Sequence, residues 1–325
     1  MAGDVPESYW RALFQFANRA GNSVTDETDR SRITHLSEED RQWLQEAMSQ
    51  LVKETDPVRQ MKEKMQELLT IDFHSPSDSD VEKGETVLND LKDLCCDINN
   101  ATDFHKIGGY RLLTPLLASP SASFRWETAA LIGELAANHE YSQEELYSAG
   151  ILPVLLELLD GDRNATVQLK VLYAISCLTT NETIEKEFVR LDGFGYVLRS
   201  MQHLFENERF QAKAAFFLQK FASNSKYQET MTKMGFVDQI AATVVSAQEG
   251  AQLSELSLNL LYTLCKDNPQ AVRECRREEL NLKNILEFKL QELQVEPEDG
   301  STRDEEILMK QILKLCWPEN VAVDR

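Results

Sequence analysis

The amino-acid sequence predicts an all-α protein, and more narrowly a right-handed α-solenoid. The chain has 325 residues, of which only 13 are glycine and 9 are proline, and this composition disfavours turn-rich β architectures. Its apolar residues recur at the spacing of a helix face. Short landmarks also recur along the chain with a period of about 42 residues, which indicates stacked repeats.

Two independent landmarks mark the repeat. The first is a short block that ends in glycine, and its last glycines lie at intervals of 41, 43 and 42 residues: Gly109, Gly150, Gly193 and Gly235. The second is an asparagine that closes an apolar helix in step with the first: Asn138, Asn181, Asn224 and Asn268. This period is the length of armadillo or HEAT units, so we expect about five armadillo-like repeats of three helices, with flanking helices.

Within a repeat, the third helix is predicted to be the most buried. In the best-defined unit, a capping box at Ser142 opens a short first helix that Gly150 closes. A second helix follows from Ile151, and a third, strongly apolar one covers 167–180. Corresponding third helices are expected over 125–137, 209–222 and 252–266.

These patterns divide the chain into four parts. Residues 1–34 read as a mostly flexible N-terminal region, and 35–84 as two N-terminal helices and an acidic linker. The armadillo-like repeat array covers 85–295, and 296–325 holds a C-terminal capping helix and a tail. The second N-terminal helix should start at Asp56-Pro57, and the final helix, over 304–317, should pack back on the last repeat.

Charge and hydropathy restrict the partners. The net charge of −20 speaks against nucleic acid and against an anionic membrane surface, since both would be repelled. The first ten residues lack the basic and apolar regions of a secretory signal, and no apolar stretch is long enough to span a bilayer. We therefore expect a cytoplasmic protein, and a monomer.

The sequence offers no chemistry for catalysis. It contains no nucleophile elbow, P-loop, dinucleotide fingerprint or His-Glu-x-x-His motif. The five histidines are scattered, and the six cysteines form no Cys-x-x-Cys pair. We expect a protein that is not an enzyme and has neither a cofactor nor a metal site.

The exposed positions of the third helices are the candidate binding surface, because these helices line the concave side of an armadillo stack. Aligning them gives three columns along the groove. The first column is Asn89, Trp126, Leu169, Ala212 and Glu255; the second is Asp93, Ala130, Tyr173, Phe216 and Asn259; the third is Asp97, Glu134, Cys177, Lys220 and Thr263.

The groove is acidic at its first end, aromatic in the middle and mixed at its last end. It lacks the repeated Trp and Asn ladder with which armadillo adaptors of the nuclear-transport type hold basic peptides. A folded domain is therefore the better partner, although such a peptide-binding adaptor stays the alternative function. The aromatic residues Trp126, Tyr173 and Phe216 could also be core residues, and the sequence leaves both readings open.

Four strings carry a resemblance to a known family. They are Arg41-Gln42-Trp43-Leu44-Gln45-Glu46-Ala47-Met48, Ala174-Ile175-Ser176-Cys177-Leu178, Arg190-Leu191-Asp192-Gly193-Phe194 and Ala271-Val272-Arg273-Glu274-Cys275-Arg276. In this order and spacing, the chain resembles the armadillo-type nucleotide exchange factors of the heat-shock protein 70 chaperones, over roughly residues 37–318.

The resemblance implies a co-chaperone. Such a protein binds the ATPase domain of a cytosolic heat-shock protein 70, grips one lobe, displaces the other, and so promotes ADP release and regulates the client folding cycle. The resemblance also implies that the groove columns contact the chaperone, together with the neighbouring Glu127, Lys170 and Lys213.

Overall fold

The computed structural model describes residues 42, 46, 56–248, 251–293 and 303–318, and within these ranges every regular element is a helix, as predicted. The chain separates into two compact units, Met1–Leu69 and Thr70–Arg325. In the first unit, α3 (Pro57–Leu69) begins at the predicted proline and buries Met61 and Leu68. The predicted N-terminal region 1–34 and the helix expected before α3 lie outside the described residues, apart from two helical positions, Gln42 and Glu46.

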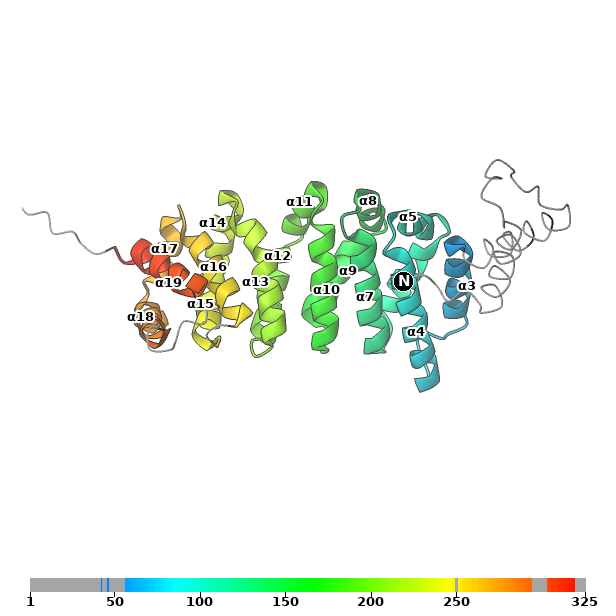
Figure 1. The fold of residues 1–325 in the computed structure, drawn as a ribbon, viewed down its shortest axis with the longest axis horizontal. Coiled ribbons are helices and arrows are strands. Elements are labelled where there is room, and N and C mark those ends of the chain that lie inside the picture. Colours follow the sequence, from blue (N-terminus) through cyan, green and yellow to red (C-terminus); the bar gives the residue numbers. More distant parts are fainter. Residues whose placement is uncertain (1–41, 43–45, 47–55, 249–250, 294–302, 319–325) are drawn as a thin grey trace, which may run out of the picture. The chain divides into compact units, whose positions relative to one another are not determined.

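The second unit contains α4 (Asp78–Cys95) followed by five repeats of three helices (Figure 1). Their first helices are α5 (Ile98–Lys106), α8 (Glu140–Ser148), α11 (Glu182–Arg190), α14 (Ser225–Met234) and α17 (Pro269–Cys275). The second helices are α6 (Leu113–Leu117), α9 (Ile151–Gly161), α12 (Gly193–His203), α15 (Phe236–Ser246) and α18 (Leu282–Leu293). The third helices are α7 (Ala122–Ala136), α10 (Ala165–Leu178), α13 (Glu208–Ala222), α16 (Gln252–Cys265) and α19 (Arg303–Cys316). Short 3₁₀ turns, η1 (Gly109–Leu112) and η2 (Glu278–Leu280), precede α6 and α18.

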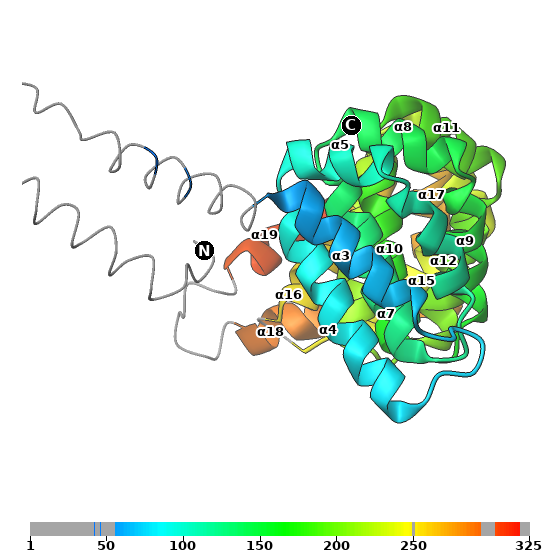
Figure 2. The same ribbon diagram turned by 90° about the vertical axis from the view of Figure 1, so that its right-hand side faces the viewer.

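The third helices and α4 form one continuous layer. Helices α4, α7, α10, α13 and α16 stand side by side, each packed on its neighbours, and α19 packs on α16 and α17 (Figure 1). The second helices α9, α12 and α15 form a layer behind them, with the first helices α8 and α11 along one edge (Figure 2). The armadillo-like arrangement of the repeats is as predicted. The final helix, expected as a cap outside the array, instead forms the third helix of the fifth repeat and packs on α16.

The asparagine landmark marks the start of the next helix, which corrects the sequence reading. The side-chain oxygens of Asn181, Asn224 and Asn268 accept backbone N–H groups of α11, α14 and α17. They are N-caps, which satisfy donors that the first turn of a helix leaves unpaired. Asn138 differs, since it adopts a left-handed backbone with φ of 53° and His139 is the N-cap of α8.

The glycine landmark is a left-handed turn between the first and second helices of a repeat. Gly150 and Gly235 have φ of 74° and 92°, a region that costs glycine nothing. In the third repeat the left-handed residue is Asp192, with φ of 60°, and Gly193 is already the first residue of α12. An aspartate tolerates this conformation better than most residues, which explains how the repeat persists there.

Two helix starts differ from the sequence reading. Helix α4 begins at Asp78, inside the stretch read as an acidic linker, because Ser77 and Asp80 form a capping box with both hydrogen bonds present. The Ser142 capping box is wrong. Helix α8 begins at Glu140, and the Ser142 hydroxyl pairs with Nδ1 of His139 at 2.7 Å inside the first turn.

Candidate partner-binding surface

The predicted groove residues lie on one face of the array. All are on α4, α7, α10, α13 or α16 except Asp97, which precedes α5. We call the solvent-facing side of these five helices the third-helix face. Each predicted residue on it is half-buried or exposed except Ala130, which is buried. The face that the columns predict is therefore accessible along its length.

The middle of this face contains a hollow of about 370 Å³ between α10 and α13. Six predicted residues from α7, α10 and α13 line it: Glu134, Leu169, Lys170, Tyr173, Lys213 and Phe216. Tyr173 is 39% exposed and Phe216 is 65% exposed, so neither is a core residue. Of the three aromatic residues, only Trp126 is half-buried.

Phe216 is exposed because its neighbours on α13 are anchored in the core. Phe217 and Phe221 are buried, and both rings pack against Phe188 of α11 with centroids 5.5 Å apart. This aromatic cluster fixes the rotation of α13 about its axis. Phe216 is about 100° away from Phe217 on the helix and so points to solvent.

Tyr173 is held by α7 on its other side. Its ring packs on Gly133, where a Cβ atom would lie 2.4 Å from the ring. Its hydroxyl donates to Oε1 of Glu134 over 3.2 Å. Burial raises the pKa of the Tyr173 hydroxyl above its ordinary value, and likewise that of the Cys177 thiol one turn along α10. The Tyr173 hydroxyl and the Cys177 thiol therefore both stay neutral near pH 7.

Charge around the hollow is of both signs. Lys170 and Lys213 line it together with Glu134. An apolar centre with charged groups at its margin is the usual anatomy of a protein interface. This arrangement fits a folded partner with a mixed surface.

At the first end of the face, predicted residues serve the fold itself. The ammonium group of Lys92 on α4 pairs with the carboxylate of Glu127, and both side chains are largely buried. Trp126 Nε1 donates to the other oxygen of the same carboxylate over 3.1 Å. Asp97 caps α5 by accepting the N–H groups of Asn99 and Asn100.

From α13 toward the last end of the face, several predicted groups form contacts within the array. Lys220 Nζ lies 2.6 Å from Glu185 of α11 and also donates to the Thr179 carbonyl. The Thr263 hydroxyl accepts from Gln219 over 2.7 Å and donates to the carbonyl of Asn259. These hydrogen bonds tie α13 to α11 and α16. Among the predicted residues outside the hollow, Asn89, Asp93, Asp97 and Glu255 are exposed, while Ala212 is half-buried.

Sequence reasoning missed Leu172, Ser176 and Phe217, which also line the hollow. The columns step four residues at a time along each helix, whereas a helix face also contains the residues three positions away. Ser176 follows Tyr173 by three and Leu172 follows Leu169 by three. Counting both spacings would have found these two residues.

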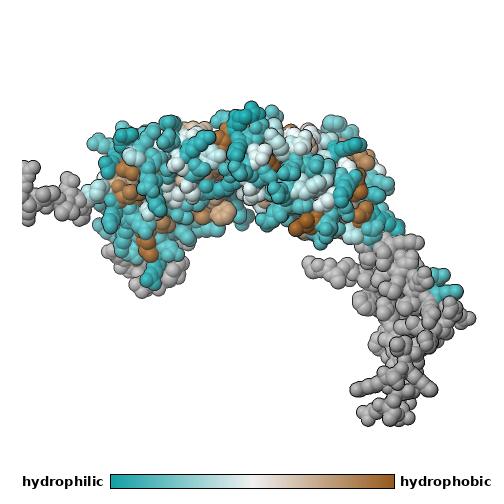
Figure 3. Space-filling view, turned by 90° about the horizontal axis from the view of Figure 1, so that it is seen from above, coloured by the Kyte–Doolittle hydropathy of each residue, from teal (hydrophilic) through white to brown (hydrophobic). Residues whose placement is uncertain are grey.

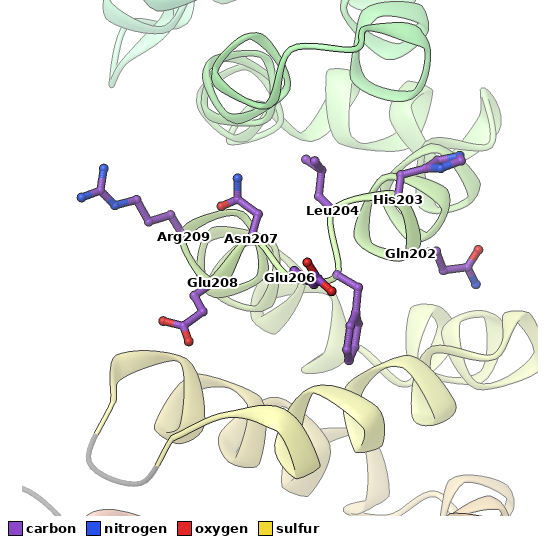
Figure 4. A pocket seen from close by; sticks show the side chains of 8 residues that line it. Gln202, His203, Leu204, Glu206, Asn207, Glu208 and Arg209 are labelled. Carbon is purple, nitrogen blue, oxygen red and sulfur yellow. The ribbon is translucent and has the colours of Figure 1, made fainter.

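A larger hollow, of about 780 Å³, lies at the turn between α12 and α13 (Figure 4). It is lined by residues 202–209 of that single segment, including Phe205. The side chains of His203, Glu208 and Arg209 point in different directions (Figure 4). Because no polar groups converge, this hollow offers no catalytic or binding constellation.

The remaining surface gives little further indication of where a partner binds. Seen from above, it is mainly hydrophilic, with separate small hydrophobic patches (Figure 3). None of the described helices combines the length and the apolar character needed to cross a bilayer.

Comparison with solved structures supports the fold alone, because the identities are low. A designed armadillo repeat protein, YIII(Dq)4CqI, is 17% identical, with a TM-score of 0.57 over 78% of this chain and 98% of that chain. Another designed armadillo repeat protein, solved in complex with peptide (KR)4, is 16% identical, with a TM-score of 0.57 over 77% of this chain and 98% of that chain.

Sequence comparison shows the family. The family model of the SIL1/FES1/HPBP1 C-terminal domain matches residues 100–209. Hsp70-binding protein 1 of Homo sapiens is 34% identical over 98% of this chain and 89% of its own length, and that of Rattus norvegicus is 35% identical over 97% and 88%. Nucleotide exchange factor SIL1 of Xenopus laevis is 29% identical over 36% of this chain and 26% of its own length. The chain therefore belongs to the SIL1/FES1/HPBP1 family, with Hsp70-binding protein 1 among its relatives.

Proposed function

We propose that this protein is a co-chaperone that binds the ATPase domain of an Hsp70 chaperone and promotes ADP release. The observation that carries the proposal is similarity over nearly the whole chain to proteins named for binding Hsp70, together with a relative named as a nucleotide exchange factor. No step of this function needs catalytic chemistry in the chain itself, and the proposed protein is not an enzyme.

The third-helix face is the proposed contact surface. The exposed rings of Tyr173 and Phe216 supply apolar area at its centre, and Lys170, Lys213 and Glu134 surround them. Large aromatic anchors inside a charged margin are where binding energy usually concentrates. One lobe of the ATPase domain would sit on this surface while the array displaces the other lobe.

Thermodynamic linkage sets the requirement for exchange. The protein must bind the open, nucleotide-free state of the chaperone more tightly than the closed state. ADP must then weaken binding of this protein by the same factor by which this protein weakens binding of ADP. Helices packed in continuous layers suit this task, because a compliant partner would deform before the chaperone does.

The test is release of a fluorescent ADP analogue from an isolated Hsp70 ATPase domain. Saturating protein should accelerate release, and Phe216→Ala should raise the concentration needed for half of the effect. Phe288→Ala is the matched control, because Phe288 is 59% exposed but lies on α18, outside the third-helix face. An unchanged release rate with folded protein would contradict the proposal.

A peptide-binding adaptor of the nuclear-transport type predicts a different result. It would bind a short basic peptide in a salt-dependent way and leave the ADP release rate unchanged. The absence of a Trp and Asn ladder from the predicted groove columns disfavours it.

Location and assembly form part of the same proposal. A cytosolic chaperone partner implies a cytoplasmic protein, and we propose that it acts as a monomer without nucleic acid or membrane. The net charge of −20 favours this, since it opposes both polyanions and self-association.

A further inference from the structure

Three thiols far apart in the sequence meet at the end of the array. Cys265 is the last residue of α16, Cys275 the last of α17 and Cys316 the last of α19. Their sulfur atoms all lie within 4.8 Å of one another, and Sγ of Cys265 and Cys275 are 3.3 Å apart. All three are at most 1% exposed. Cysteine counting overlooks this cluster because Cys265 and Cys316 are 51 positions apart in the sequence.

The sulfur spacing fits a shared metal ion. Metal–thiolate bonds are about 2.3 Å long, so three sulfurs around one ion in a plane lie about 4 Å apart. All three sulfurs lie within 4.8 Å of one another, and the Cys265–Cys275 pair, at 3.3 Å, is somewhat closer than this value. Side-chain movements below about 1 Å would bring the sulfurs to ligand positions.

The surroundings select a soft ion that accepts three ligands. Among the described residues, no histidine or carboxylate joins the three sulfurs. Zn²⁺ in protein sites almost always takes four ligands, whereas Cu⁺ is soft, prefers thiolates and is stable with three of them. A positive charge is at hand, because Nε of Arg276 donates to the carbonyl oxygen of Cys316. Three thiolates around one monovalent cation leave a net negative charge, and this guanidinium would offset part of it.

We propose that Cys265, Cys275 and Cys316 form a binding site for one Cu⁺ ion, whose binding displaces the three thiol protons to solvent. The ion would join α16, α17 and α19 and so lock the last repeat together. Each ligand closes its helix, where the final turn opens most readily, and local opening there would admit the ion. This inference is independent of the proposed chaperone function.

The test is anaerobic titration of the reduced full chain with Cu⁺ against a coloured chelator of known affinity. The other three cysteines are removed first, in the background variant Cys95→Ala, Cys96→Ser, Cys177→Ser. This variant should keep one equivalent of Cu⁺ in the presence of the chelator, and its Tm should rise by about 5 °C or more. Cys316→Ala in the same background should lose both effects. Retention of the equivalent by this last variant would contradict the proposal.

X-ray absorption of the Cu⁺-loaded natural sequence provides a readout that needs no variant. The proposal requires three sulfur neighbours at about 2.3 Å. Two sulfur neighbours, or nitrogen or oxygen neighbours, would overturn it, and so would a failure of Cu⁺ to bind. A stoichiometric Zn²⁺ ion bound in preference to Cu⁺ would overturn the assignment of the ion.

Discussion

The middle and the ends of the third-helix face use the same kinds of residue for different purposes. In the middle, Tyr173 and Phe216 are exposed around a hollow. At the first end, the Glu127 carboxylate is already paired with Lys92, and on α13, one turn beyond Phe216, the Lys220 ammonium is already paired with Glu185. The difference teaches that a charged residue among the predicted groove contacts can serve the array instead of a partner.

This contrast locates the expected binding energy. Aromatic side chains that are exposed in the free protein and buried in a complex contribute most, whereas a charge that already has a partner must first be released. We therefore expect variants in the middle to weaken binding and variants at the ends to weaken the fold.

The largest effect is expected from Phe216→Ala. Loss of a central aromatic anchor costs about 2 kcal/mol of binding free energy, or roughly 30-fold in affinity for the ATPase domain. Stability should change little, because the ring is exposed. Isothermal calorimetry measures the affinity, with Phe288→Ala as the control that stays within about twofold. Equal losses of affinity for Phe216→Ala and Phe288→Ala would contradict the assignment of the partner contact to the middle of the third-helix face.

Glu127→Ala should act on stability. It leaves the Lys92 ammonium largely buried without its carboxylate and removes the acceptor of Trp126 Nε1, at a cost of about 1 to 2 kcal/mol of unfolding free energy. Urea denaturation measures this cost, and binding by the folded variant should be nearly unchanged. Weakened binding at full stability would show that the first end contacts the partner.

Asp97→Ala should cost about 1 kcal/mol of unfolding free energy, because it removes the N-cap of α5. Asp97→Asn is the matched control, since asparagine caps helices equally well. Both variants should accelerate ADP release as the natural sequence does. A loss of exchange in both would instead assign the Asp97 carboxylate to the partner contact.

The smallest effect is expected from Tyr173→Phe. The ring stays against Gly133, and only the hydrogen bond to Glu134 is lost, at less than about 1 kcal/mol of stability or binding. Tyr173→Ala should weaken binding far more. Calorimetry on the two variants separates the ring from the hydroxyl, and equal losses would show that the hydroxyl is the contact.

The repeat architecture was predictable because its causes are local. Apolar spacing defines each third helix, and the cap residues Asn181, Asn224 and Asn268 recur at each junction. Their role was misread, because an asparagine between two helices can be assigned to the end of one or to the start of the next. The sequence also did not show that Asp192 instead of Gly193 has the left-handed backbone, because no local pattern distinguishes the two positions.

It was less predictable whether each groove residue is exposed to solvent or paired within the array. Alignment placed Lys220 and Phe216 in neighbouring columns, but the pairing of Lys220 with Glu185 depends on how α13 packs on α11. The exposure of Phe216 depends on the buried ring of Phe217 beside it. Such contacts arise between helices, and the sequence of one helix does not contain them.

The central claim is that the middle of the third-helix face contacts the Hsp70 ATPase domain. Site-specific photocrosslinking tests it most directly, with benzoylphenylalanine placed at Phe216 or, as the control, at Phe288 on α18. The account predicts a crosslink to the ATPase domain from the first position and none from the second, with ADP lowering the yield through linkage. A crosslink from Phe288 and none from Phe216 would contradict it.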